Sequence, residues 1–151
     1  MHESLTPRMD RIIKLAQQIA RDYDRDYVGT EHLLLAILKE GTGTGSAILR
    51  KHGIDFAMAR SVVDKYVRAS LEETWVFGRL PGTPHFRDVM KTAIEEARQL
   101  ESRVVCAEHL LIALARAEGS VAHAALGEMG IKAPTVRAAI NHHLENGEQG
   151  E

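Results

Sequence analysis

The chain has 151 residues, with 19 Lys and Arg against 21 Asp and Glu, for a formal net charge of −2. This length suits one domain with a sizeable core, and the interspersed charges offer no basic stripe for nucleic acid. Cys106 is the only cysteine, which excludes a disulfide framework and a cysteine-based metal cluster. No run approaches the roughly 18 apolar residues of a membrane span, so we expect a soluble, cytoplasmic protein.

The first half of the chain predicts two long helices. Thr6 before Pro7 is typical of an N-cap and first turn, and apolar residues then follow one helical face to about residue 23. Thr30-Glu31 begins a second helix that is apolar nearly all round. Such a segment is expected to be buried on most sides, as the core helix of this half.

Two shorter helices should complete this half. The Gly- and Thr-rich run 41–46 is expected to end the second helix. A short third helix should then start at Ala47 and stop at Gly53. Asp55 then caps a fourth helix, with Val63 in its buried stripe.

The second half repeats this plan about 77 positions later, with helices at about 84–101, 107–117, 120–129 and 133–145. Thr6-Pro7 returns as Thr83-Pro84, and the four residues from Glu31 return from Glu108. Eight helices and no convincing strand predict an all-α fold of two four-helix repeats. We expect one domain over 1–151, with repeat one at 5–69, a linker at 70–82, repeat two at 83–145 and a polar tail at 146–151.

A half of about 65–75 residues would have only a marginal hydrophobic core of its own, so the two halves are expected to share a single core. That common core should contain Leu33, Leu34, Ile37, Leu110, Leu111 and Leu114. The linker holds the only tryptophan, and its apolar residues either pack back across both halves, which we favour, or form an exposed docking patch. They are Trp75, Val76, Phe77 and Leu80.

The Glu-His pair is polar yet present in both copies, at Glu31-His32 and Glu108-His109. Each carboxylate either suits the macrodipole at the first turn of a helix or belongs to a binding site. For each histidine the favoured interpretation is a semi-buried structural slot.

Several kinds of catalytic chemistry are not supported. The run 41–46 lacks the Lys-Ser/Thr of a phosphate loop, and no strand precedes it. Glu31-His32 has no second histidine four residues on, and His142-His143 point to different helix faces, so no metal site is predicted. Cys106 stands where the first half has Gly29, which favours a small packing residue over a reactive thiol. We therefore expect no enzymatic activity and no cofactor.

Binding is better supported than catalysis. Thr6 and Thr83 each open a helix whose first N–H groups favour an anion. Glu31 and Glu108 each open another helix and can accept a bidentate guanidinium. A ligand with an anionic head beside a guanidinium, such as phosphoarginine, would suit both.

The duplicated pattern of Thr-Pro, Glu-His-Leu-Leu and Gly-Ile resembles the Clp N-terminal (Clp repeat) domain over about residues 5–144. The resemblance implies eight helices with pseudo-two-fold symmetry, in a domain that precedes the ATPase modules of Clp-family AAA+ unfoldases. Such domains bind adaptor proteins or degradation-tagged protein substrates. The alternative is a stand-alone accessory subunit that regulates assembly of a Clp protease complex.

The resemblance is closest to the ClpC-like branch, whose domains can carry two phosphoarginine pockets. Carried over here, one pocket would use Thr6 and Glu31, and the other Thr83 and Glu108. Arg87 would help to hold phosphate in the second pocket. The position equivalent to Arg87 in the first copy is the acidic Asp10, and Thr30 becomes Ala107 in the second copy, so the second pocket is favoured.

Overall fold

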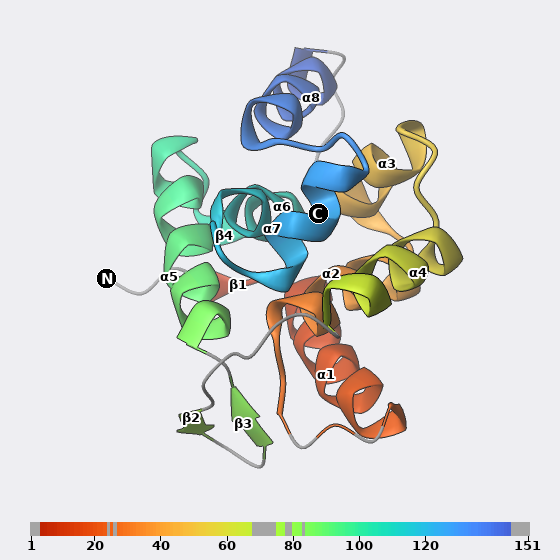
Figure 1. Ribbon diagram of the computed structural model, residues 1–151. Helices are drawn as coiled ribbons and strands as arrows, with labels where there is room; N and C mark the ends of the chain where they lie inside the picture. Colours follow the sequence, from red (N-terminus) through yellow and green to blue (C-terminus); the bar gives the residue numbers. More distant parts are fainter. Residues whose placement is uncertain are drawn as a thin grey trace.

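The computed structural model describes residues 4–23, 25, 27–67, 75–77, 80–82 and 84–145 (Figure 1). Eight α-helices account for most of them, which confirms the expected all-α class of two four-helix repeats. They are α1 (Pro7–Asp22), α2 (Thr30–Glu40), α3 (Gly43–Lys51), α4 (Phe56–Val67), α5 (Pro84–Gln99), α6 (Ala107–Arg116), α7 (Val121–Glu128) and α8 (Ala133–Glu145).

Helix α1 shows how local sequence sets an element. The hydroxyl of Thr6 accepts a hydrogen bond from the backbone N–H of Met9 at 3.1 Å, and Pro7 occupies the first turn. The buried side chains of the helix recur at helical spacing on one face, so α1 covers the core with that face and exposes the other. They are Met9, Ile12, Ala16, Ile19 and Ala20.

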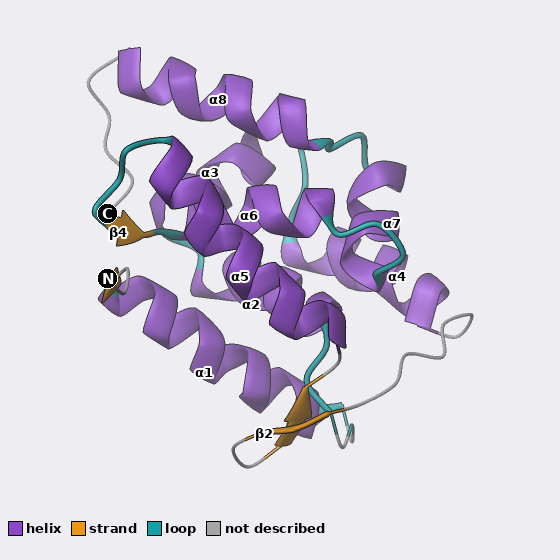
Figure 2. Cartoon of the chain, turned by 90° about the vertical axis from the view of Figure 1, so that its left-hand side faces the viewer, coloured by secondary structure: helices purple, strands orange, loops and turns teal. Residues whose placement is uncertain are grey.

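Helices α2 and α6 form the centre of the domain, and both views show them enclosed by the other helices (Figures 1 and 2). The six leucine and isoleucine side chains expected to form a shared core are each at most 1% exposed and belong to one contiguous cluster, which confirms the prediction. Burial of this cluster from water is the main contribution to stability. The residues are Leu33, Leu34, Ile37, Leu110, Leu111 and Leu114.

The expectation of no strand is wrong for four short segments. β1 (Ser4–Leu5) pairs in parallel with β4 (Val104–Val105), and β2 (Trp75–Phe77) pairs in antiparallel with β3 (Leu80–Gly82). Each segment is too short to carry a clear alternating pattern. The β1–β4 pair joins the start of the first repeat to the second repeat, which matters for the site.

The β2–β3 hairpin occupies the predicted linker, below α1 and α5 in Figure 2. The side chains of Trp75, Val76, Phe77 and Leu80 lie outside the described part of the chain. Their packing across the two halves therefore stays a prediction.

Helix α3 begins at Gly43 and not at Ala47. The prediction that the whole run 41–46 is a non-helical break between two helices is therefore wrong. Only Gly41, with a φ of 76°, ends the preceding helix α2. A Cβ on Gly45 would lie 3.1 Å from the carbonyl carbon and oxygen of Ala107. The glycine thus lets α3 approach α6 closely, and this packing outweighs the low helix propensity of glycine.

The two repeats contact each other through equivalent positions. The hydroxyl of Thr30 accepts a hydrogen bond from the backbone N–H of Ala122 at 3.2 Å. Its counterpart in the second repeat, Ala107, packs against Gly45, which is the counterpart of Ala122. The same pair of surfaces therefore meets twice, as pseudo-two-fold symmetry requires.

Candidate functional site

The two histidines of the repeated Glu-His pair are structural. His32 Nδ1 accepts a hydrogen bond from the backbone N–H of Gly29, and His109 Nδ1 accepts one from Cys106, each at 2.9 Å. Both rings are at most 4% exposed. Burial, with a smaller contribution from Arg25, lowers the pKa of His32 to about 4, and burial lowers the pKa of His109. Both rings are therefore neutral caps near pH 7, as the structural interpretation predicted.

The two glutamates occupy the first turns of α2 and α6, and both are buried, at 2% exposed for Glu31 and 6% for Glu108. The hydroxyl of Tyr27 donates to Glu31 Oε2 at 3.3 Å. A buried carboxylate loses the stabilisation that water gives its charge. Position at a helix N-terminus offsets part of that loss, because the macrodipole there favours a negative charge.

Thr6 and Glu31 lie at opposite ends of α1, so their assignment to one pocket is wrong. Glu31 lines a cavity together with Asp22 at the end of α1. Arg8 in the first turn of α1 instead contacts Glu40 at the end of α2, with Nε···Oε1 3.5 Å. Helix α1 has 16 residues and so spans about 24 Å, which separates its two ends too far for one small ligand.

Thr6 lies instead beside the first turn of α6 in the other repeat. Its backbone N–H donates to the carbonyl of Val105 at 3.3 Å. Glu108 follows Val105 by three residues, a chain distance of at most about 11 Å. The starts of α1 and α6 thus share one edge of the domain, which we call the α1–α6 edge and define by Thr6, Arg8, Val105 and Glu108.

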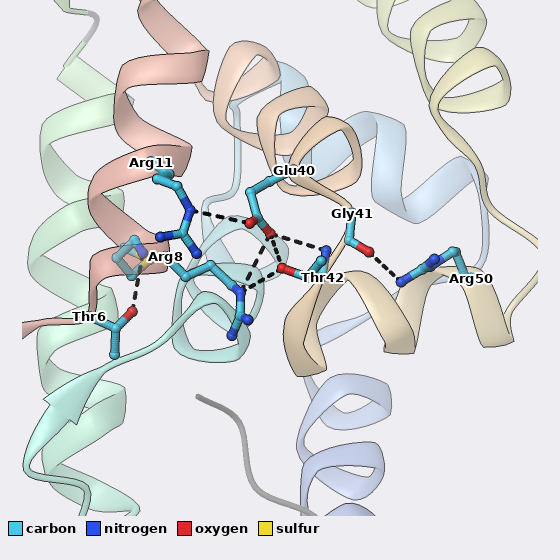
Figure 3. A network of polar contacts seen from close by, with 8 residues as sticks. Thr6, Arg8, Arg11, Glu40, Gly41, Thr42 and Arg50 are labelled. Carbon is cyan, nitrogen blue, oxygen red and sulfur yellow. Dashed lines mark hydrogen bonds and ion pairs between the residues drawn. The ribbon is translucent and has the colours of Figure 1, made fainter.

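A polar network fixes the arginine of this edge (Figure 3). Arg8 Nε donates to the hydroxyl of Thr42 at 2.8 Å, and Thr42 in turn donates to Glu40 at 2.7 Å. Arg11 Nε lies 3.5 Å from the other oxygen of Glu40. The hydrogen bonds from Thr42, followed by Arg8 and Arg11, lower the pKa of Glu40 against the opposing effect of burial. Glu40 is therefore ionised near pH 7 and holds Arg8 in place.

Thr83 lies outside the described residues, so its pairing with Glu108 stays a prediction. His85, two residues on, is close to Gly119, where a Cβ would lie 3.5 Å from the ring Nε2. Gly119 follows the end of α6, whereas Glu108 is in its first turn, and the helix spans about 15 Å between them. Arg87 is exposed in the first turn of α5.

The start of α5 lies near the start of α2 in the first repeat. Ala122, which donates to the hydroxyl of Thr30 in the first turn of α2, is three residues from Gly119. The sequence analysis grouped the predicted residues within each repeat, whereas Thr6 contacts Val105 of the other repeat. The sequence analysis also did not select Arg8, although Arg8 directly follows Pro7 in the first turn of α1. The counterpart of Arg8 in the second repeat is His85.

Two further properties concern metal binding and membranes. Across the described residues, no three His, Cys, Asp or Glu side chains are grouped to hold a metal ion. In the same part of the chain, no single helix has the length and apolar composition to cross a membrane. Helices α6 and α7 pass that test only as a pair, bent by 92° at the break between them.

These features define a class of α-helical domain made of two symmetric repeats, with helix starts from opposite repeats meeting at its edges. The model of the Clp repeat (R) N-terminal domain matches residues 4–74 and 82–151. The chain belongs to this family.

Similar proteins are Clp ATP-binding subunits and chaperones. The chain is 34% identical over 140 residues to a chloroplastic ClpA homolog, an ATP-binding subunit of the ATP-dependent Clp protease, from Brassica napus. It has the same identity, over the same length, to the chloroplastic chaperone protein ClpC1 of Arabidopsis thaliana. Each match covers 93% of this chain but only 16% and 15% of those relatives. The chain thus spans a small part of the length of these relatives.

Solved structures with the same fold include the N-terminal domain of the chaperone ClpD from Arabidopsis thaliana, with a TM-score of 0.73 and 23% identity over 95% of this chain and 96% of that one. The N-terminal domain of Hsp104 from Candida albicans matches with a TM-score of 0.69 and 16% identity, over 98% and 95% of the two chains. At these identities the likeness establishes the fold.

Proposed function

We propose that this chain is a non-catalytic recognition module of the Clp chaperone and protease system. It binds adaptor proteins or tagged protein substrates for delivery to a AAA+ unfoldase. Family membership and the relatives named as Clp ATP-binding subunits support this assignment. Clp AAA+ unfoldase or protease subunits are then its expected partners, and its cytoplasmic location stays a prediction.

The observation that carries the proposal is the hydrogen bond from Thr6 to Val105, which joins the start of α1 to the start of α6. The start of α1 favours an anion, and Arg8 adds a positive charge that Glu40 and Thr42 hold in place. Glu108 supplies a carboxylate for a cation. Phosphorylated arginine carries both groups, so we propose that the α1–α6 edge binds a phosphoarginine side chain.

A second edge is proposed at the start of α5, where Arg87 would act with Glu31. The contacts of Thr30 with Ala122 and of His85 with Gly119 support this grouping. Each edge then has one arginine in its first helical turn, Arg8 in one and Arg87 in the other. Asp10, which reduces the positive potential, belongs to the α1–α6 edge.

Titration calorimetry with a short peptide that carries one phosphoarginine and blocked termini tests this function. We expect two peptides per chain. Glu108→Ala should weaken one site by more than about 1.5 kcal/mol, or roughly tenfold, since the guanidinium loses a charged acceptor in a partly desolvated place. Glu95→Ala, at an exposed position of α5, is the matched control and should bind like the wild type.

If the wild type gives no binding heat at millimolar peptide, the proposed phosphoarginine sites are ruled out. Equal affinity of the peptide for the wild type and for the Glu31→Ala, Glu108→Ala double variant would also rule them out. Binding to purified Clp subunits without any effect of these substitutions would favour the accessory-subunit function.

A further inference from the structure

A cavity of about 350 Å³ lies on the first repeat, between the end of α1, the start of α2 and one face of α4. This volume is at the lower end of the range for small-molecule sites. Its floor is aliphatic, with Leu35 from α2 and Val63 and Val67 from α4. Most of the other lining residues are polar or charged, so the cavity suits a small polar molecule with a short apolar part.

Charges of both signs surround this floor. Asp22, Glu31 and Asp64 supply three carboxylates, and Arg25 and Arg60 supply two guanidinium groups. Arg60 lies over the ring of Tyr23, with its guanidinium carbon 4.5 Å from the ring centroid. Among the described residues, no ion pair involves Arg25, Arg60 or Asp64. These three side chains are therefore not neutralised by an ion pair within the described part of the chain, whereas Glu31 accepts a hydrogen bond from Tyr27.

Glu31 belongs to this cavity because residue 29 is glycine. A Cβ at position 29 would overlap the carboxylate of Glu31, which folds back against the Gly29 backbone. The counterpart of Gly29 in the second repeat is Cys106, whose side chain is buried. That side chain occupies the corresponding space, so Glu108 cannot take the same position. Glycine at 29 thus selects the orientation of the buried Glu31 carboxylate.

The second repeat shows that the fold does not need these charges. The counterparts of Asp22, Arg25 and Asp64 are the neutral residues Gln99, Ser102 and Asn141. Arg137, the counterpart of Arg60, is engaged with the buried Glu96 at 2.5 Å. The same helical framework therefore forms without the charged set. Asp22 accepts a hydrogen bond from Gln18 at 2.8 Å and is at the C-terminus of α1, where the macrodipole disfavours a negative charge.

We infer that this cavity binds a small zwitterion of the amino-acid class. The ligand carboxylate would lie between Arg25 and Arg60, as guanidinium groups favour. The ammonium group would lie at Glu31 with Asp22 and Asp64, and an apolar side chain would cover Leu35 and the two valines. The site shares Glu31 with the edge proposed at the start of α5, but its arginines and aspartates belong to neither phosphoarginine edge.

Titration calorimetry of the full chain with the twenty common amino acids, beginning with L-leucine, tests the inference. At least one should bind saturably. Its N-acetyl derivative, which lacks the ammonium group, and its amide, which lacks the carboxylate, should each bind at least about tenfold more weakly, since each loses one charged interaction. Glu31 is common to this cavity and to the edge proposed at the start of α5, so competition by the phosphoarginine peptide does not separate the two tests. Arg60→Gln and Asp64→Asn separate them, because both should leave binding of the blocked-terminus phosphoarginine peptide unchanged.

Substitutions locate the binding. Arg60→Gln and Asp64→Asn change exposed residues of α4 and should each weaken the amino acid about tenfold. Arg103→Gln and Glu95→Gln likewise neutralise one basic and one acidic side chain, at exposed positions of the second repeat, and should not change the affinity for the amino acid. The inference is overturned if none of the twenty binds saturably at millimolar concentration, if a blocked form binds as tightly as the free amino acid, or if the α4 variants bind like the wild type.

Discussion

Thr30 and Ala122 are 92 residues apart in sequence, yet the hydroxyl of Thr30 accepts the backbone N–H of Ala122 at 3.2 Å in the buried interface between the repeats. The second repeat replaces this hydrogen bond with direct contact between Ala107 and Gly45. The two symmetric contacts are thus made by different chemistry. One uses a polar group that needs its partner, and the other uses two small residues.

Replacing Thr30 with valine keeps the shape but leaves the N–H of Ala122 buried without an acceptor. We expect a loss of about 1–3 kcal/mol in the free energy of unfolding, measured by urea denaturation. Thr30→Ser restores the hydroxyl and should recover most of the loss. Equal stability of the valine variant and the wild type would show that the hydrogen bond contributes nothing.

Leu34→Ala and Leu111→Ala should each lower the free energy of unfolding by about 2–5 kcal/mol, because both side chains are fully buried and their removal leaves cavities. Urea denaturation measures the change. Met58→Ala, at a side chain that is 43% exposed, is the control and should cost much less. A cost for the leucine variants no larger than for Met58→Ala would contradict the shared core.

Acid should destabilise the fold through His32. Its pKa is about 4 in the folded chain and about 6.5 when exposed, so the unfolded chain binds more protons between these values. The stabilising contribution is complete above about pH 6.5 and declines as the pH falls to about 4, by roughly 3 kcal/mol in total. The lowered pKa of His109 acts in the same direction.

His32→Gln isolates this effect, because glutamine at the same position can still accept the backbone N–H of Gly29 but does not titrate. The difference in unfolding free energy between pH 7 and pH 5 should be smaller in this variant than in the wild type. An unchanged pH dependence in His32→Gln would contradict the assignment.

Local patterns in the sequence were enough to predict the helices and the core. Thr6, Pro7 and the apolar spacing of α1 act within a few residues of one another, and the apolar runs around Leu34 and Leu111 identify buried helices without knowledge of their neighbours. The start of α3 was not predicted correctly, because glycine has low helix propensity and the close approach of Gly45 to Ala107 is a tertiary contact.

The grouping of the site residues depends on how the two repeats are assembled. Thr6 and Glu31 belong to one repeat, yet α1 separates them, and the partner of the α1 start is Val105 in the other repeat. Strands of two residues carry no periodic signal that would reveal this contact. Arg8 was not selected because its role depends on Glu40 and Thr42, more than 30 positions away.

The most direct test of the cross-repeat site is mapping of amide chemical shifts with the blocked-terminus phosphoarginine peptide. We expect the amides of Thr6, Arg8 and Met9 to shift together with those at 105–109. Glu108→Ala should raise the peptide concentration needed for both sets about tenfold, and Glu31→Ala should leave both sets unchanged. Shifts of Thr6, Arg8 and Met9 that are unchanged in Glu108→Ala and weakened in Glu31→Ala would contradict the cross-repeat site.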